Sequence, residues 1–296
     1  MRAAPAFLYV VGVALFCVMD AVIKHLIESY PVVMVTWWRY IFAVGFTIAM
    51  WWAAGRPAIT RQILPLHILR GSIIAVSAFS FFWSLTRLTL AEAVTFSFMA
   101  PLMVPPLASL MLKERMQPGN LAAAALGFAG VLVAVGFSTE ALTPRRLEGI
   151  GSVLVAAATY AVATVLMRAR AAKDGPAIVS LLGAAVPTLV LAPFVLFGLP
   201  AGLRLPRDLP DVGWFVLAGL CGALALQLFA RAYAQLEAQQ LAPFEYTALA
   251  WAALLGWVIF QEPVYPRTWA GAALIIAACL WQARRLPADS PATPVA

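Results

Sequence analysis

The feature that most constrains this chain is a succession of unbroken apolar stretches, each about 20 residues long, that runs from the first residues almost to the last. A bilayer core about 30 Å thick is crossed by about 20 residues of helix, at 1.5 Å per residue. Hydrophobic residues make up 63% of the chain and charged residues 11%, against about 45–50% and about 25% in soluble domains. The sequence therefore predicts an all-α membrane protein.

Ten stretches satisfy this length, and turn-forming or charged residues separate them. The expected spans are 6–26, 32–54, 66–85, 93–112, 120–137, 147–167, 178–197, 212–230, 241–260 and 265–281. The first stretch is longer than the apolar core of a signal peptide, so we interpret it as the first transmembrane helix. The tail, residues 282–296, is rich in Pro, Ala and Ser and is expected to be disordered in the cytoplasm.

Basic residues in the connections predict the orientation of the spans, because Lys and Arg are more frequent on the cytoplasmic side. The side of the amino terminus has twelve of them: Arg2, Arg56, Arg61, Arg70, Lys113, Arg115, Arg168, Arg170, Lys173, Arg231, Arg284 and Arg285. The opposite side has seven: Lys24, Arg87, Arg145, Arg146, Arg204, Arg207 and Arg267. Both termini are therefore expected in the cytoplasm. The basic residues form no stripe, so the net charge of +7 does not indicate nucleic acid binding.

The two halves of the chain resemble one another. A shift of 148 residues lays Glu114, which ends the fourth span, on Glu262, which ends the ninth. Because each half has five spans, an odd number, the second half must be inverted in the membrane relative to the first. We therefore expect two inverted five-helix repeats, 6–137 and 147–281, around a central cavity. Many secondary transporters are organised in this way.

Several runs of residues carry a resemblance to a known family. They are Phe82-Trp83-Ser84-Leu85, Ala91-Glu92-Ala93, Pro101 within the fourth span, Leu112-Lys113-Glu114-Arg115 at its end, and Pro31 followed by Arg39 in the second span. With a Gly-rich fifth span, this pattern resembles the EamA-type repeat of the drug/metabolite transporter superfamily. Within this superfamily, the chain most resembles bacterial exporters of aromatic amino acids and of methyl viologen. The resemblance implies an inner-membrane carrier whose cavity is built mainly from spans 1, 3, 4, 6, 8 and 9. The position in the second half that corresponds to Pro101 is occupied by Leu249, so helix breaks in the two halves need not be symmetrical.

Aromatic and hydroxyl side chains project from the spans expected to form the cavity. An apolar pocket with a few hydroxyls suits a flat organic solute and can hold a cation against aromatic rings. The candidates for the substrate cavity are Phe79, Phe82, Trp83, Phe98, Met99, Tyr160, Thr164, Tyr246 and Trp251. Packing in the helical core is the alternative role for each of them.

Charged residues inside spans cost about 2.5–3.5 kcal/mol each on insertion scales, so they are expected to face the bundle interior. The candidates are Asp20, Lys24, Arg39, Arg231 and Glu245. Asp20 and Lys24 are spaced i, i+4 and can pair on one helix face, and Arg39 can pair with Asp20 or a helix end. Glu245 either binds a substrate ammonium or exchanges protons, or it faces cytoplasmic water or Arg231. Arg231 either reaches a substrate carboxylate or anchors its span in the cytoplasm.

The sequence contains no recognisable enzymatic machinery. The two histidines are far apart, and there is no metal-ligand cluster, phosphate-binding loop or Ser-His-acid set. No cofactor or metal is therefore expected, and the absence of a Walker motif means that ATP does not drive the protein directly. The three cysteines are interpreted as small buried apolar residues.

Together these observations predict a secondary transporter that exports small organic metabolites by alternating access. Aromatic or hydrophobic amino acids are the first expected substrates and lipophilic cations the next, with facilitated export favoured over proton coupling. A carrier of nucleotide sugars or phosphorylated sugars is the alternative, disfavoured because the cavity spans lack a Lys or Arg cluster for phosphate charges. A membrane-embedded enzyme is less favoured. The expected partners are the substrate and the lipid bilayer, in a monomer or a homodimer.

Overall fold

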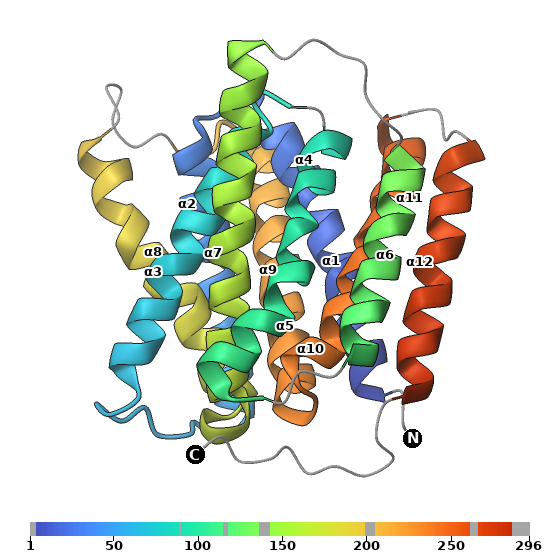
Figure 1. The fold of residues 1–296 in the computed structure, drawn as a ribbon. Helices are drawn as coiled ribbons and strands as arrows, with labels where there is room; N and C mark the ends of the chain where they lie inside the picture. The colour runs from blue at the N-terminus through green and yellow to red at the C-terminus, as the bar shows by residue number, and fades with distance from the viewer. Residues whose placement is uncertain are drawn as a thin grey trace.

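The computed structural model describes residues 4–88, 90–114, 118–135, 143–198, 205–260 and 266–285, and the regular secondary structure in these ranges is helical. Ten helical segments cross the bundle (Figure 1). Eight of them are long and apolar enough to span a membrane, and two shorter apolar helices, Pro118–Val133 and Trp269–Gln282, complete the set. The predicted ten-helix membrane fold is confirmed.

Eight of the ten segments are single helices, and two are broken. The single helices are α1 (Ala4–Leu26), α2 (Val32–Ala53), α3 (Leu64–Ser84), α6 (Pro118–Val135), α7 (Pro144–Asp174), α8 (Pro176–Phe197), α9 (Leu209–Gln235) and α12 (Pro266–Arg285). The fourth segment consists of α4 (Leu90–Ser97) and α5 (Met99–Leu112), and the ninth of α10 (Ala238–Leu241), the 3-10 helix η1 (Ala242–Thr247) and α11 (Ala248–Phe260).

Three helices differ clearly from the predicted spans. α9 (Leu209–Gln235) extends beyond both ends of the predicted 212–230. α7 extends beyond both ends of the predicted 147–167. At its amino end the Thr143 side chain caps the helix and accepts a hydrogen bond from the Arg146 N–H, and at its carboxyl end the helix continues to Asp174. α12 continues to Arg285, so residues 282–285 are helical rather than disordered. The rest of the predicted tail, 286–296, lies outside the described residues, as does Glu262.

Proline interrupts the fourth segment. The helix breaks at Phe98, between α4 and α5. Pro101 follows three residues later and has no N–H to donate to the Ser97 carbonyl, which removes one helical hydrogen bond. The break therefore has a local cause that can be read from the sequence.

The ninth segment breaks at the corresponding place although Pro101 has no counterpart there. Pro243 lies in η1 and cannot continue the α-helical hydrogen bonding. At the shift of 148 residues Phe98 corresponds to Tyr246, and the centroids of these two rings are 5.4 Å apart. The breaks of the two halves are thus symmetrical in position and meet inside the bundle.

The four most extensive helix contacts all join one half of the chain to the other. α1 packs on α9, α3 on α7, α2 on α8 and α6 on α12. In the repeat, α1 corresponds to α7 and α3 to α9, so the α1–α9 and α3–α7 contacts are equivalent. The α2–α8 and α6–α12 contacts each join a helix to its own counterpart, as two-fold-related inverted repeats require. Figure 1 shows that α1 and α7, the first helices of the two halves, enter the bundle from opposite faces. The start of α1 and the end of α12 lie at the same face.

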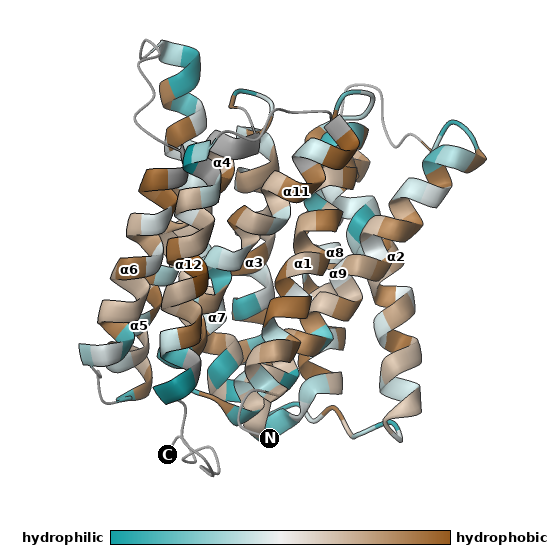
Figure 2. Ribbon diagram, turned by 90° about the vertical axis from the view of Figure 1, so that its right-hand side faces the viewer, coloured by the Kyte–Doolittle hydropathy of each residue, from teal (hydrophilic) through white to brown (hydrophobic). Residues whose placement is uncertain are grey.

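The outside of the bundle is apolar. Hydrophobic residues cover most of the helix length, and hydrophilic residues gather at the two ends (Figure 2). Phe7, Leu110, Leu189 and Trp269 are between 66% and 80% exposed. Such a surface is unfavourable in water and suits lipid, so the chain is a multi-pass membrane protein.

Residues in the connections should be accessible from opposite sides of the membrane. Thr60 is exposed between α2 and α3, and Ser29 is exposed between α1 and α2. In a variant with Cys17, Cys221 and Cys279 changed to Ala, Thr60→Cys should react with an impermeant maleimide from the cytoplasmic side only. Ser29→Cys should react from the opposite side only. The measurement compares labelling in right-side-out and inverted vesicles. Labelling of both from one side would contradict the fold, and reversed labelling would contradict the orientation predicted from the basic residues.

Candidate substrate cavity

A cavity of about 180 Å³ lies between the two halves of the bundle. Side chains from α1, α2, α3, α4, α5, α7, α9, η1 and α11 line it. In terms of spans these are numbers 1, 2, 3, 4, 6, 8 and 9. The family resemblance implied all of them except span 2, which contributes Arg39 and Tyr40.

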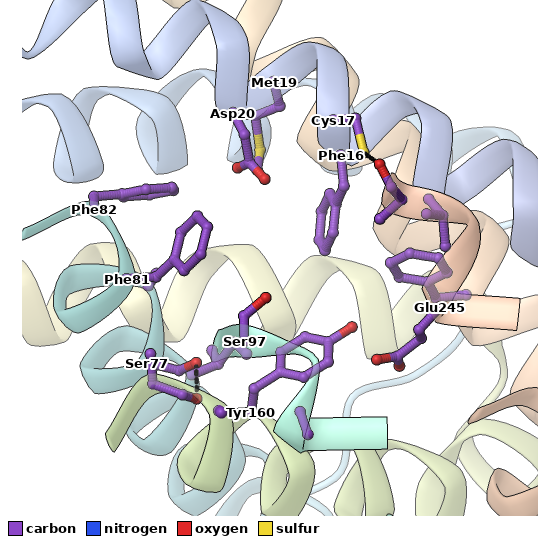
Figure 3. A pocket seen from close by; sticks show the side chains of 18 of the residues that line it. Phe16, Cys17, Met19, Asp20, Ser77, Phe81, Phe82, Ser97, Tyr160 and Glu245 are labelled. Atoms are coloured by element: carbon purple, nitrogen blue, oxygen red, sulfur yellow. Dashed lines mark hydrogen bonds between the residues drawn. The ribbon is translucent and has the colours of Figure 1, made fainter. Parts of the chain in front are cut away.

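Aromatic rings from several helices contribute to the apolar wall (Figure 3). The lining rings are Phe16, Tyr40, Phe81, Phe82, Phe98, Tyr160 and Phe229. Phe16 and Phe229 meet edge to face with their centroids 5.0 Å apart, a favourable geometry for aromatic pairs. Rings contributed by both halves therefore form a wall against which a flat apolar group can pack.

Glu245 is the acid that the broken ninth segment brings to this cavity. Its side chain is buried, and it is part of the lining. The Tyr9 hydroxyl donates to Glu245 Oε1 over 2.5 Å, and the Tyr9 and Tyr233 hydroxyl oxygens are 2.9 Å apart. The Tyr160 hydroxyl points toward the same carboxylate (Figure 3). Among the described residues Glu245 forms no ion pair, so phenol hydroxyls rather than a cation hold it.

Asp20 and Arg39 line another part of the cavity. The Arg39 guanidinium carbon lies 3.9 Å from the centroid of the Tyr40 ring and 5.5 Å from that of Phe82, and Nη1 lies 2.9 Å from the Met19 sulfur. Arg39 and Asp20 interact electrostatically without a direct ion pair. The cavity therefore contains two carboxylates and one guanidinium.

Two lining hydroxyls are already engaged with backbone carbonyls. Ser77 donates to the Ala156 carbonyl over 2.9 Å, and Ser97 donates to the Val94 carbonyl over 2.7 Å. Charged groups and aromatic rings are therefore the main chemistry that the cavity offers to a solute. Among the described residues no group of His, Cys, Asp and Glu side chains is arranged to hold a metal ion.

Six of the fourteen site residues predicted from the sequence lie in the wall of this cavity. Phe82, Phe98, Tyr160, Asp20, Arg39 and Glu245 line the cavity. Thr164 lines a smaller pocket beside it. The structure thus brings together three of the five charged candidates.

The other aromatic candidates and Met99 do not line the cavity. Phe79 and Met99 are 36% and 37% exposed. Phe79 comes directly after Ala78, a lining residue, so it is turned by about 100° around α3. Trp83 packs against Arg87, whose guanidinium carbon lies 3.3 Å from the ring centroid.

Four further candidates have other surroundings. Tyr246 is fully buried behind the cavity wall, and Trp251 is half-buried against the hydrophobic core. Lys24 is half-buried one turn beyond Asp20, and Arg231 is exposed on α9. Neither cation belongs to the cavity lining, so the alternative in which Glu245 faces water or Arg231 does not describe the structure.

Sequence reasoning missed several residues of the site. Tyr9 and Phe16 are seven residues apart, so they share one face of α1 with the predicted Asp20, four residues further on. Phe229 and Tyr233 are likewise four residues apart on α9. This spacing was a usable signal, but the apolar stretches contain many aromatic residues with similar spacing.

Arg70 corrects the sequence analysis, which counted it among the cations of the connections. Its side chain is buried in α3 at 2% exposure and lines a second pocket of about 50 Å³, together with Arg39. Arg70 from span 3 and Arg39 from span 2 thus line one pocket, which the sequence analysis did not anticipate. Hydropathy missed Arg70 because a single cation in a long apolar stretch does not reveal its depth or its neighbours.

Arg168 was also counted among the connections and is buried in α7. Its Nε lies 3.2 Å from Glu114 Oε1, and its Nη1 donates to the Tyr233 carbonyl over 2.8 Å. Burial raises the pKa of the Glu114 carboxyl, and Arg168 opposes that rise. These contacts tie the end of α5 in the first half to α7 and α9 in the second.

Comparison with protein families agrees with this architecture. The model of the EamA-like transporter family matches residues 4–136 and 147–283, two segments that together cover most of the chain. The chain belongs to the EamA-like transporter family. The family assignment from the sequence is confirmed, and the protein is a membrane transporter rather than an enzyme.

Individual relatives have different substrates in their names. The chain is 28% identical to a riboflavin transporter of Brucella anthropi over 260 residues, which cover 86% of this chain and 89% of the relative. It is 26% identical to a pseudopaline exporter of Pseudomonas aeruginosa over 268 residues, 90% of each chain. It is 25% identical to an S-adenosylmethionine uptake transporter of Rickettsia felis over 264 residues, 88% and 86% of the two chains. None of these names refers to aromatic amino acids or methyl viologen.

A solved crystal structure shares the fold. It superimposes with a TM-score of 0.78 at 20% sequence identity and covers 97% of this chain and 99% of the other. At this identity the likeness describes the fold alone.

Phe81 and Phe79 provide a matched pair for testing the cavity. Phe81→Ala removes a lining ring, whereas Phe79→Ala removes an exposed ring two residues away on the same helix. An aromatic contact is worth about 0.5–1.5 kcal/mol, so Phe81→Ala should raise the apparent Kd for an aromatic solute, with L-phenylalanine as the test probe, roughly two- to tenfold. Phe79→Ala should leave it unchanged in counterflow assays with reconstituted liposomes. An equal effect of both substitutions would show that this wall does not contact the substrate.

Proposed function

We propose that this protein is a facilitative exporter of small organic solutes that combine an aromatic or hydrophobic group with an ammonium group. Aromatic amino acids are the first substrates of this proposal, and lipophilic cations are the second. The observation that carries it is Glu245, a buried carboxylate held by tyrosine hydroxyls at the edge of an aromatic cavity. A substrate ammonium supplies the positive partner that the described neighbours do not provide.

The volume of the cavity supports a solute of amino acid size. Pockets for drug-sized ligands measure about 300–1,000 Å³, whereas this cavity measures about 180 Å³. Riboflavin, for which one relative is named, is larger than an amino acid and would need a wider cavity than this conformation offers. We therefore rank single amino acids above large ring systems as substrates.

The names of two relatives bear on the charge of the substrate and on the direction of transport. S-adenosylmethionine contains an aromatic ring system, a cationic sulfur and an amino acid group, so a relative named for its uptake supports a substrate with a ring and a positive charge. A relative named as a pseudopaline exporter supports export. We propose export from the cytoplasm across the bacterial inner membrane, with both termini on the cytoplasmic side.

Alternating access would use contacts between the two halves at both faces of the bundle. At one face Arg168 binds Glu114. At the other, the Tyr30 hydroxyl, in the α1–α2 connection, donates to the Asp211 carboxylate and accepts from the Arg207 N–H over 2.9 Å. We propose that the halves rock so that these contacts separate in turn and open the cavity to one side at a time.

A carrier of anionic sugars is the second candidate, because Arg39 and Arg70 are two buried guanidiniums in adjoining pockets. Two observations rank it lower. Asp20 and Glu245 line the same cavity and repel a phosphate group, and a cavity of about 180 Å³ is small for a nucleotide sugar.

Replacing Glu245 by Gln tests the proposed function. The change keeps the shape of the side chain but removes the charge, and hydrogen bonds to charged groups contribute about 1.5–3 kcal/mol. Counterflow of L-phenylalanine and of phenethylamine, which both carry an ammonium, should therefore weaken about tenfold or more in Glu245→Gln. Glu148→Gln is the matched control, because the Glu148 side chain is 59% exposed and pairs with Arg87 outside the cavity. Unchanged transport in Glu245→Gln would place the ammonium site elsewhere.

Facilitated transport makes a separate prediction for wild-type protein. With a substrate gradient and no pH gradient, liposomes should equilibrate the substrate on both sides. An imposed pH gradient should change the rate of exchange but not produce accumulation above the external concentration. Uphill accumulation driven by the pH gradient would show proton coupling and would overturn this part of the proposal.

A further inference from the structure

The second pocket opens beside the main cavity and shares part of its wall. Phe16, Arg39, Tyr160 and Phe229 are among the residues that line both spaces. The pocket measures about 50 Å³. One water molecule needs only about 10–15 Å³ of such space, so a group of three heavy atoms such as a carboxylate fits.

Two guanidiniums line this pocket, and each has an N–H donor that makes no hydrogen bond to the described residues. Arg39 and Arg70 are 4% and 2% exposed. Arg70 Nη1 donates to the Val179 carbonyl over 3.3 Å, and Arg39 contacts a sulfur and aromatic rings. The Nε atoms of both side chains are buried without a hydrogen-bond partner among the described residues. Buried unpaired donors on a charged group are costly, which indicates that a ligand completes the site.

The surrounding helices leave room for these side chains. Gly183 of α8 and Gly222 of α9 line the pocket. A Cβ at Gly183 would lie 3.1 Å from Arg70 Nη1, and a Cβ at Gly222 would lie 3.1 Å from Arg39 Nη1. Two glycines therefore let the helices approach the two guanidiniums closely.

The charges of the two spaces are sorted by sign. Asp20 and Glu245 line the main cavity but not the second pocket, and Arg70 lines the second pocket but not the main cavity. Arg39 lies where the two spaces meet. Among the described residues that line the second pocket none is acidic. A solute across this junction meets negative charge on one side and positive charge on the other.

We infer that the pocket between Arg39 and Arg70 binds the carboxylate of the substrate, while its ammonium faces Glu245 and its apolar group lies among the rings of the main cavity. This inference rests on the proposed function and narrows it to zwitterions of the α-amino acid type. Guanidinium groups bind carboxylates through paired, charge-assisted hydrogen bonds. Lipophilic cations without a carboxylate then become poor substrates.

Two probes that differ only in the carboxylate test the inference in wild-type protein. L-phenylalanine and phenethylamine share the ring and the ammonium, and phenethylamine lacks the carboxylate. Wild-type transporter in liposomes should bind L-phenylalanine at least tenfold more tightly, measured as the half-saturating concentration in counterflow. Equal affinity for both would overturn the inference while leaving the proposed ammonium site intact.

Arg70→Gln tests which residue provides the discrimination. The substitution keeps a polar side chain at this position, but the charge is lost. L-phenylalanine should bind at least tenfold more weakly and phenethylamine equally well, so the preference disappears. Arg231→Gln, which removes an exposed cation of the same kind, should keep the full preference. A preference that persists in a folded Arg70→Gln protein would overturn the inference.

A third probe separates failure of the inference from failure of the proposed function. 3-Phenylpropionate has the ring and the carboxylate but no ammonium, and its binding to purified wild-type protein can be followed by thermal stabilisation. Stabilisation that is lost in Arg70→Gln would support the carboxylate pocket even if no amino acid were transported. If chloride stabilises the protein through Arg70 and does not compete with L-phenylalanine, the pocket holds an inorganic anion and the inference is wrong. If Arg70→Gln does not fold, competition between 3-phenylpropionate and L-phenylalanine is measured in wild-type protein. Competition would support the carboxylate pocket, and its absence would overturn the inference.

Discussion

The interior of a bilayer offers no hydrogen-bond partners, so a helix can break there only where protein surrounds the break or a cavity meets it. Both broken segments of this transporter obey that constraint. Phe98 at the break of the fourth segment is 3% exposed, and the residues from Ala242 to Tyr246 in η1 are buried. The two breaks meet through Phe98 and Tyr246. The position of the cavity follows from this meeting, because the same breaks carry Ser97 and Glu245 into its wall.

A second constraint is the cost of charge in an apolar bundle. Phenol hydroxyls hold Glu245, aromatic rings and a sulfur surround Arg39, and Glu114 pairs with Arg168. Arg70 has a single carbonyl acceptor in the described structure. Among the described residues Arg39, Arg70 and Glu245 thus form no ion pair, whereas Glu114 and Arg168 pair with one another. This difference separates charges that hold the fold together from charges that are available to a solute.

The relatives show how one fold serves different solutes. Chains with 25–28% identity to this one are named for riboflavin and S-adenosylmethionine transport, so the architecture itself does not select the substrate. In the present chain the cavity is small, aromatic and lined by groups of both signs. Those three properties, rather than the family, are the basis for proposing amino acids.

The sequence by itself determined the membrane class, the ten spans, the repeat and the family, because each follows from the length and order of apolar stretches or from local motifs. It also singled out Asp20, Arg39 and Glu245, since charges are conspicuous in apolar helices. Only the tertiary structure decided which way each helix faces. Phe81 lies in the cavity wall and Phe79 at the surface because the two side chains point in different directions around α3. Arg70 is buried within the bundle, although its position in the sequence suggested a residue of the connections. In lipid, hydrophobic residues are favourable both inside and outside the bundle, so the pattern of hydrophobicity that orients a helix in a soluble protein is nearly absent.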